Sequence, residues 1–217
     1  EPHYAAALTA FPEDRRALAG LGRVRYAQCD LPGAIAAYTR LTAQTPQIPE
    51  LATLGDLYYL AGRIQDAAAQ YAALERLPTQ QARLHPDHTH HVRQLALFYA
   101  DHGIQTDTAY ALAAQDYALR PSVAAADALA WTAFKAGKLQ EAQAQIQAAL
   151  RLGTQEAQVY YHAGMIAQAA GAPDQARAWL ERALTLNPRF APWQAEQAQH
   201  ALATLDATAP EAAKAAP

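Results

Sequence analysis

Residues 51–74 read LATLGDLYYLAGRIQDAAAQYAAL, and this stretch decides the fold. Apolar residues recur every three to four positions on both sides of Gly62, which is the spacing of two amphipathic helices separated by a short break. Gly55 lies within the first predicted helix and Ala67 lies early in the second. Small residues at these points let two helices approach closely, so the stretch predicts an antiparallel helix pair.

The same unit recurs at intervals of about 34 residues along the chain. The first copy contains Leu18-x2-Leu21-Gly22 in its first predicted helix and Ala34-x3-Tyr38 in its second. The copies span Ala17–Pro46, Glu50–Thr79, Val92–Pro121, Ala125–Thr154 and Val159–Pro188. Five copies of one helical unit predict a solenoid, in which each unit buries its apolar face against its neighbours.

This pattern resembles the tetratricopeptide repeat (TPR) family, whose units of 34 residues are helix–turn–helix pairs. The resemblance implies an all-α, right-handed superhelix of antiparallel helix pairs that ends in a capping helix. The third and fourth units carry Ala96 and Ala130 where the family prefers Gly, a change that small size makes tolerable. No run of Val, Ile and Thr alternates with a period of two, so we expect no sheet.

The repeat phase predicts one solenoid over residues 1–206. It consists of a partial repeat at 1–14, repeats at about 15–48, 48–81, 89–122, 123–156 and 157–190, and a capping helix at 190–206. Because residues 1–11 match only the end of a repeat, we expect the chain to be a fragment of a longer protein. Residues 207–217 are rich in Ala and Pro, and we expect them to be disordered.

Composition limits the partners and the compartment. The formal net charge of −3 gives no general attraction to nucleic acid, and no apolar run is long enough for a transmembrane helix. The single cysteine, Cys29, excludes an internal disulfide and occupies a helix–helix break where the family often has Gly. Repeats three to five resemble bacterial TPR proteins, which leaves open the cytoplasm or, if a leader preceded residue 1, the periplasm or export. The oligomeric state also stays open, with end-to-end association as one possibility.

The resemblance implies a concave groove, lined by the first helix of each pair, that holds an extended peptide or a partner helix. Carried over through the repeat phase, the groove residues are Arg16, Arg23, Tyr26, Asp56, Tyr59, Arg93, Leu97, Asp127, Trp131, Phe134, Lys135, Tyr161, His162, Met165 and Gln168. Aromatic and Arg side chains are typical anchors of binding hot spots. Burial between helices is the alternative for each aromatic residue, and for Trp131 above all. The predicted function is a non-enzymatic protein- or peptide-binding scaffold without a cofactor, acting as an adaptor or assembly factor in a bacterium.

Metal binding is the alternative function. An insertion that shifts the repeat phase contains four imidazoles, at His85, His88, His90 and His91, and imidazole suits zinc, copper or nickel. The simpler interpretation is that Pro86-Asp87 begins the next helix, with these histidines in its solvated first turn. A second candidate cluster combines Asp101-His102 with Asp127 and His162 in the groove. The chain lacks a nucleophile elbow, a P-loop, a dinucleotide fingerprint and an HExxH motif, so no catalytic residue is predicted.

Overall fold

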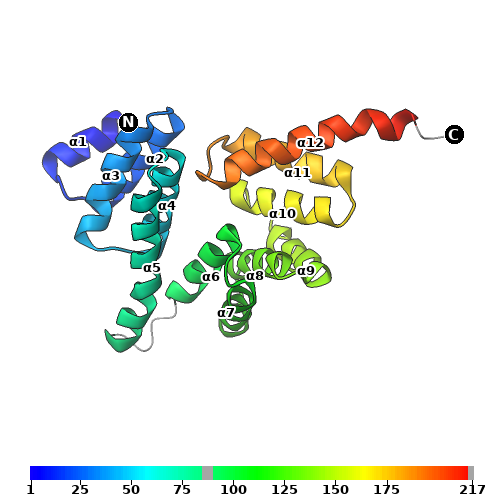
Figure 1. Ribbon diagram of the computed structural model, residues 1–217, viewed down its shortest axis with the longest axis horizontal. Helices are drawn as coiled ribbons and strands as arrows, with labels where there is room; N and C mark the ends of the chain where they lie inside the picture. The colour runs from blue at the N-terminus through cyan, green and yellow to red at the C-terminus, as the bar shows by residue number, and fades with distance from the viewer. Residues whose placement is uncertain (85–89, 215–217) are drawn as a thin grey trace. The chain divides into compact units, whose positions relative to one another are not determined.

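The computed structural model describes residues 1–84 and 90–214, with side chains described for residues 1–77 and 91–207. Within these ranges the chain forms twelve helices and no strand (Figure 1). It divides into two compact units, Glu1–Gln94 and Leu95–Pro217, which are described separately below. The predicted all-α class is confirmed.

Unit 1 contains α1 to α5, and each of the first four of these helices packs on the next one. The helices are α1 (Pro2–Ala10), α2 (Arg15–Ala27), α3 (Leu31–Gln44), α4 (Ile48–Leu60) and α5 (Ile64–Leu84). Large apolar residues from three of them, including Leu18, Leu41 and Leu57, are almost completely buried in one core. This burial of one face of each helix is what the apolar periodicity predicts.

Unit 2 is built in the same way, with a smaller-residue core. It takes in the end of α6 (His90–His102), followed by α7 (Thr106–Leu119), α8 (Val123–Lys135), α9 (Leu139–Leu150), α10 (Ala157–Ala169), α11 (Pro173–Leu186) and α12 (Gln194–Lys214). Its main core combines Ala130 and Ala133 of α8 with Ile146 of α9 and Ile166 of α10. Alanine at these positions lets the helix axes come close together, so large residues are needed at only a few points.

Left-handed residues end the first helix of each pair. Gly62, Gly103, Gly137 and Gly171 have φ between 64° and 75°, and Cys29 takes the equivalent place with φ 64°. After α4, for example, the amide of Gly62 donates to the carbonyl of Tyr59 at 2.9 Å and the amide of Arg63 donates to that of Tyr58 at 2.9 Å. This Schellman pattern satisfies the last carbonyls of the helix and favours Gly at the left-handed position. The breaks read from the sequence are therefore helix C-caps.

Close packing explains the glycines inside the first helices. A Cβ atom added at Gly55 would lie 2.3 Å from the ring of Tyr71, and one added at Gly164 would lie 2.6 Å from Leu180. Each clashing side chain belongs to the second helix of the same pair. The sequence argument that small residues permit close approach is confirmed at these points.

The helix bounds agree with the predicted repeats at several starts and differ at the end. The helices α2, α4, α8 and α10 begin at residues 15, 48, 123 and 157, where repeats were expected to begin. The last helix begins at Gln194 and continues to Lys214, whereas the sequence predicted a capping helix over 190–206. Residues 215–217 of the predicted tail lie outside the described residues. The grouping of all repeats into one solenoid, and the disorder of the tail, stay predictions.

Candidate functional site

A cleft of about 430 Å³ opens in unit 1. Its lining comes from Tyr4 on α1, from Arg16, Ala19 and Arg23 on α2, from Tyr38 on α3, and from Pro49, Glu50 and Thr53 on α4. This volume lies within the range of small-ligand pockets in proteins. The cleft therefore has room for a side chain or a short peptide segment.

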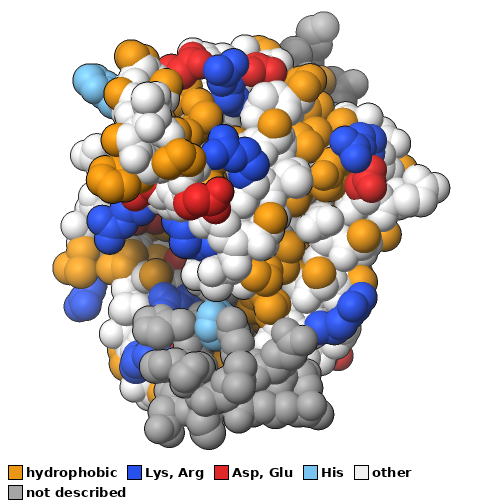
Figure 2. Space-filling view, turned by 90° about the vertical axis from the view of Figure 1, so that its left-hand side faces the viewer, with side chains coloured by type: hydrophobic (Ala, Val, Ile, Leu, Met, Phe, Trp, Pro, Cys, Tyr) orange, Lys and Arg blue, Asp and Glu red, His pale blue; other side chains and the backbone are white. Residues whose placement is uncertain are grey.

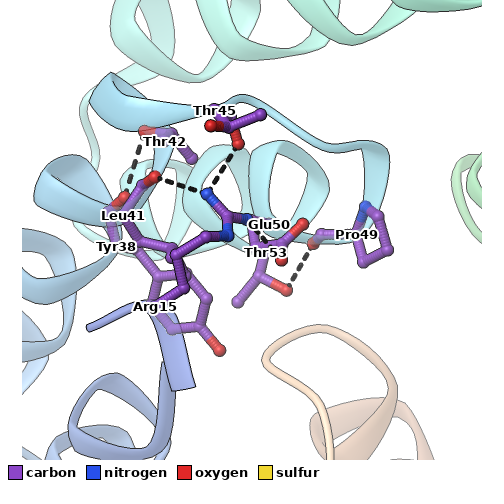
Figure 3. A network of polar contacts seen from close by, with 8 residues as sticks. All are labelled: Arg15, Tyr38, Leu41, Thr42, Thr45, Pro49, Glu50 and Thr53. Atoms are coloured by element: carbon purple, nitrogen blue, oxygen red, sulfur yellow. Dashed lines mark hydrogen bonds and ion pairs between the residues drawn. The ribbon is translucent and has the colours of Figure 1, made fainter. Parts of the chain in front are cut away.

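Arg15 holds one wall of the cleft in place. Its guanidinium donates to the carbonyl oxygens of Leu41 at 3.3 Å and Thr45 at 2.8 Å, and it forms an ion pair with Glu50 at 3.2 Å (Figure 3). These contacts join the start of α2 to the end of α3 and the start of α4. Asp14 caps α2, because its carboxylate accepts a hydrogen bond from the backbone amide of Ala17 at 2.7 Å. This cap fixes the turn that carries Arg15 and Arg16.

The lining of the cleft combines tyrosine side chains with charges of both signs. Tyr38 is buried, and this burial raises the pKa of its hydroxyl. The Arg23 guanidinium acts in the opposite direction and Glu50 adds to the rise, so both charges lie near the tyrosine. One Glu50 oxygen, Oε1, is the atom paired with Arg15, so this carboxylate already has one cationic partner within the protein.

Arg16 and Arg23 are the predicted groove residues that line this cleft. Both side chains are exposed, and neither forms an ion pair with a described carboxylate. The other groove residues predicted for unit 1 lie elsewhere. Asp56 is buried and accepts a hydrogen bond from Tyr71 at 2.7 Å, whereas Tyr59 is 45% exposed. Tyr26 and Arg93 are half-buried and do not line the cleft.

The repeat phase explains why these residues meet, although sequence reasoning missed most of them. Tyr38 follows Tyr4 by 34 positions (38 − 4), and Thr53 follows Ala19 by the same number (53 − 19). Glu50 stands at the position of Arg16 in the next repeat (50 − 16 = 34). The cleft is thus lined by matching positions of consecutive repeats. Carrying Arg16 forward by one repeat would have found Glu50.

In unit 2, the predicted groove anchors are interior residues. Trp131 is 1% exposed, and Tyr161 and His162 are completely buried. Asp127 is also buried, while Phe134, Lys135, Met165, Leu97 and Gln168 are half-buried. The expectation that Trp131 and Tyr161 present open aromatic surface to a partner is therefore corrected. The last helix also contributes to this burial, because the Tyr161 hydroxyl donates a hydrogen bond to Gln197 of α12 at 2.9 Å.

A polar network connects these buried rings. His162 Nδ1 and Asp127 Oδ1 are 2.9 Å apart, and the His162 ring stacks on Trp131 with a centroid separation of 4.3 Å. The indole Nε1 of Trp131 donates to Asp101 Oδ1 at 2.8 Å. Burial raises the pKa of the Asp101 carboxyl and lowers that of the Lys135 ammonium. The network ties α6, α8 and α10 together within unit 2.

The structure gives limited information on the metal hypothesis. It brings Asp127 against His162, but among the described residues no three potential ligands gather around one point. His91 is half-buried on α6. His85 and His88 lie outside the described residues, as does the side chain of His90.

Comparison with known proteins identifies the repeats. The tetratricopeptide repeat model matches residues 1–49 and 128–189, which together make up 111 of the 217 residues (49 + 62). No curated protein sequence matches the chain. In the part of the chain that the structure describes, no helix is both long and apolar enough to cross a membrane.

Two solved structures illustrate the shared fold. A chain of the APC/C hetero-tetramer Cut9-Hcn1 is similar with a TM-score of 0.53 and 17% identity, over 94% of this chain and 38% of that one. The present chain therefore spans well under two thirds of that protein's length. The TPR protein TTC0263 of Thermus thermophilus is similar with a TM-score of 0.52 and 19% identity, over 74% of this chain and 82% of that one. With its repeats matched over more than half of its length, the chain belongs to the tetratricopeptide repeat family.

Proposed function

We propose that this protein is a non-enzymatic scaffold that binds a peptide segment of a protein partner in the cleft of unit 1. The TPR fold is typical of proteins that mediate protein–protein interaction. The observation that carries the proposal is that this cleft is lined by two tyrosines and by two exposed arginines that form no ion pair with any described carboxylate. Arginine and tyrosine are enriched at the energetic centres of protein interfaces. An adaptor or assembly role in a bacterium fits such a site.

The surface charge also favours a protein partner. Figure 2 shows one face of the molecule, on which basic, acidic and apolar side chains are mixed. A nucleic-acid phosphate backbone is bound best by a continuous basic track, whereas mixed surfaces of this kind are common in protein interfaces. The buried groove residues of unit 2 are less suited to this role, because a partner would have to displace α12 residues to reach Tyr161.

A random peptide library displayed on phage tests the proposal without assuming a partner. Peptides enriched by the wild-type protein are measured against Thr53→Trp, which fills the cleft, and against Gln65→Trp, which adds the same side chain on an exposed part of α5 outside it. We expect the enriched peptides to lose binding to Thr53→Trp and to retain it with Gln65→Trp. Circular dichroism confirms that both variants are folded. Enrichment of no peptide, or equal binding to both variants, would contradict the proposal.

A further inference from the structure

The charge distribution on α2 narrows the class of peptide. This helix carries four arginines, Arg15, Arg16, Arg23 and Arg25, and no acidic residue. Arg15 pairs with Glu50, and Arg25 pairs with Glu1 at 2.7 Å and with Asp30 at 2.8 Å. Two of the four positive charges are therefore neutralised by carboxylates of the protein. The other two, on Arg16 and Arg23, are the two that line the cleft.

The cleft is thus left with two arginines that form no ion pair with a carboxylate in the described part of the chain. Glu50, the one acidic residue among the described residues of the lining, pairs with Arg15, which itself lies outside the lining. A guanidinium donates two parallel hydrogen bonds to a carboxylate, which makes arginine well suited to bind acidic groups. We infer that the cleft binds a peptide segment with two acidic side chains, one for Arg16 and one for Arg23; this inference rests on the proposed peptide-binding function.

The spacing of the two arginines sets the spacing of the two acids. Arg16 and Arg23 are seven residues apart on one helix, so they share a face and are separated by about 10.5 Å along the axis. A peptide in the polyproline II conformation rises about 3.1 Å per residue and has three residues per turn. Acidic residues at positions i and i+3 of such a peptide lie on one side, about 9.3 Å apart. This distance is close to the roughly 10.5 Å between the two arginine positions, and the flexible arginine side chains can cover the difference.

The aromatic lining of the cleft suits this extended peptide. The residues between the two acids would meet Tyr4 and Tyr38, and aromatic walls of this kind accommodate proline well. The inferred ligand is therefore an extended acidic segment with Pro or another apolar residue between its two carboxylates.

Synthetic peptides capped at both ends test the inference, because they offer no terminal carboxylate. The probe is acetyl-Gly-Glu-Pro-Ala-Glu-Gly-amide, compared with the analogue in which both Glu are Gln and with one in which the second Glu is moved by one position. Isothermal titration calorimetry at low ionic strength gives the affinities of the unlabelled peptides. We expect measurable binding of the first peptide, at least tenfold weaker binding of the Gln analogue, and weaker binding of the shifted one.

Protein variants identify the side chains responsible. Arg16→Gln and Arg23→Gln should each weaken binding of the Glu peptide by roughly three- to fivefold, as expected for exposed ion pairs. Arg76→Gln removes a charge from an exposed site on α5 outside the cleft and should leave binding unchanged. Equal affinity for the Glu and Gln peptides, unchanged binding by both arginine variants, or no binding of the Glu peptide at millimolar concentration would overturn the inference.

The two proposals fail in different ways. If library peptides bind in a manner that Thr53→Trp abolishes while Arg16→Gln and Arg23→Gln do not affect it, the cleft binds peptides but does not select acidic ones. If no library peptide depends on the cleft, the peptide-binding proposal fails as well.

Discussion

Replacing Cys29 by glycine should stabilise the protein. Cys29 has φ 64°, the left-handed conformation that the equivalent Gly62, Gly137 and Gly171 adopt with φ between 73° and 75°. A residue with a Cβ atom pays about 1–2 kcal/mol to stay in this region. The thiol is exposed, so its removal costs little packing. Glycine also raises the conformational entropy of the unfolded chain, which reduces the gain in the free energy of unfolding by about 0.4–1 kcal/mol. The expected net gain for Cys29→Gly is therefore about 1 kcal/mol in the free energy of unfolding.

Urea denaturation followed by circular dichroism measures this gain, and a gain of that size corresponds to a rise of about 2–4 °C in Tm. Cys29→Ala is the matched control, because it removes the thiol but keeps the Cβ atom and should leave stability nearly unchanged. Gly62→Ala is the reciprocal change; a Cβ atom there meets nothing within 4 Å, so a loss of about 1 kcal/mol would come from the backbone alone. If Cys29→Ala stabilises as much as Cys29→Gly, the thiol rather than the backbone is responsible and the reasoning is refuted.

Two further predictions concern the buried network of unit 2. Trp131→Ala should lower the free energy of unfolding by about 3–5 kcal/mol, because it leaves a cavity at a site that is 1% exposed. Trp131→Phe should lower it clearly less, and urea titration compares the two variants. A small loss for Trp131→Ala would contradict the burial of this side chain. Asp101→Asn keeps the acceptor for the Trp131 indole but removes a charge whose burial raises the carboxyl pKa. A raised pKa means that the folded state binds the proton more tightly, so the contribution of Asp101 to stability is greatest at low pH and is lost as the pH rises through its folded value. Asp101→Asn should thus exceed the wild type in stability at about pH 7, and the difference should shrink near the ordinary aspartate pKa of about 3.9; a difference independent of pH would contradict this.

The helices and their ends were predictable from the sequence because they depend on local interactions. Apolar residues three and four positions apart mark one face of a helix, whatever that face packs against. Gly62 and Gly171 mark C-caps because the left-handed turn excludes most residues with a Cβ atom. The close approach of the two helices in a pair was also predictable, since a side chain at Gly55 would clash with the Tyr71 ring. A period of about 34 residues then assigned these pairs to one family.

Which of the predicted groove residues are exposed was decided only by the tertiary structure. Arg16 and Trp131 were both predicted as groove residues from the repeat phase, yet Arg16 is exposed at a cleft and Trp131 is buried. The difference comes from contacts between residues distant in sequence: Trp131 bonds to Asp101, 30 residues away, and Tyr161 bonds to Gln197, 36 residues away. A repeat pattern places a side chain on a helix face, but exposure depends on which other helices cover that face. In this protein the sequence by itself determined the helices and their pairing, and long-range packing decided which of the predicted groove residues are exposed.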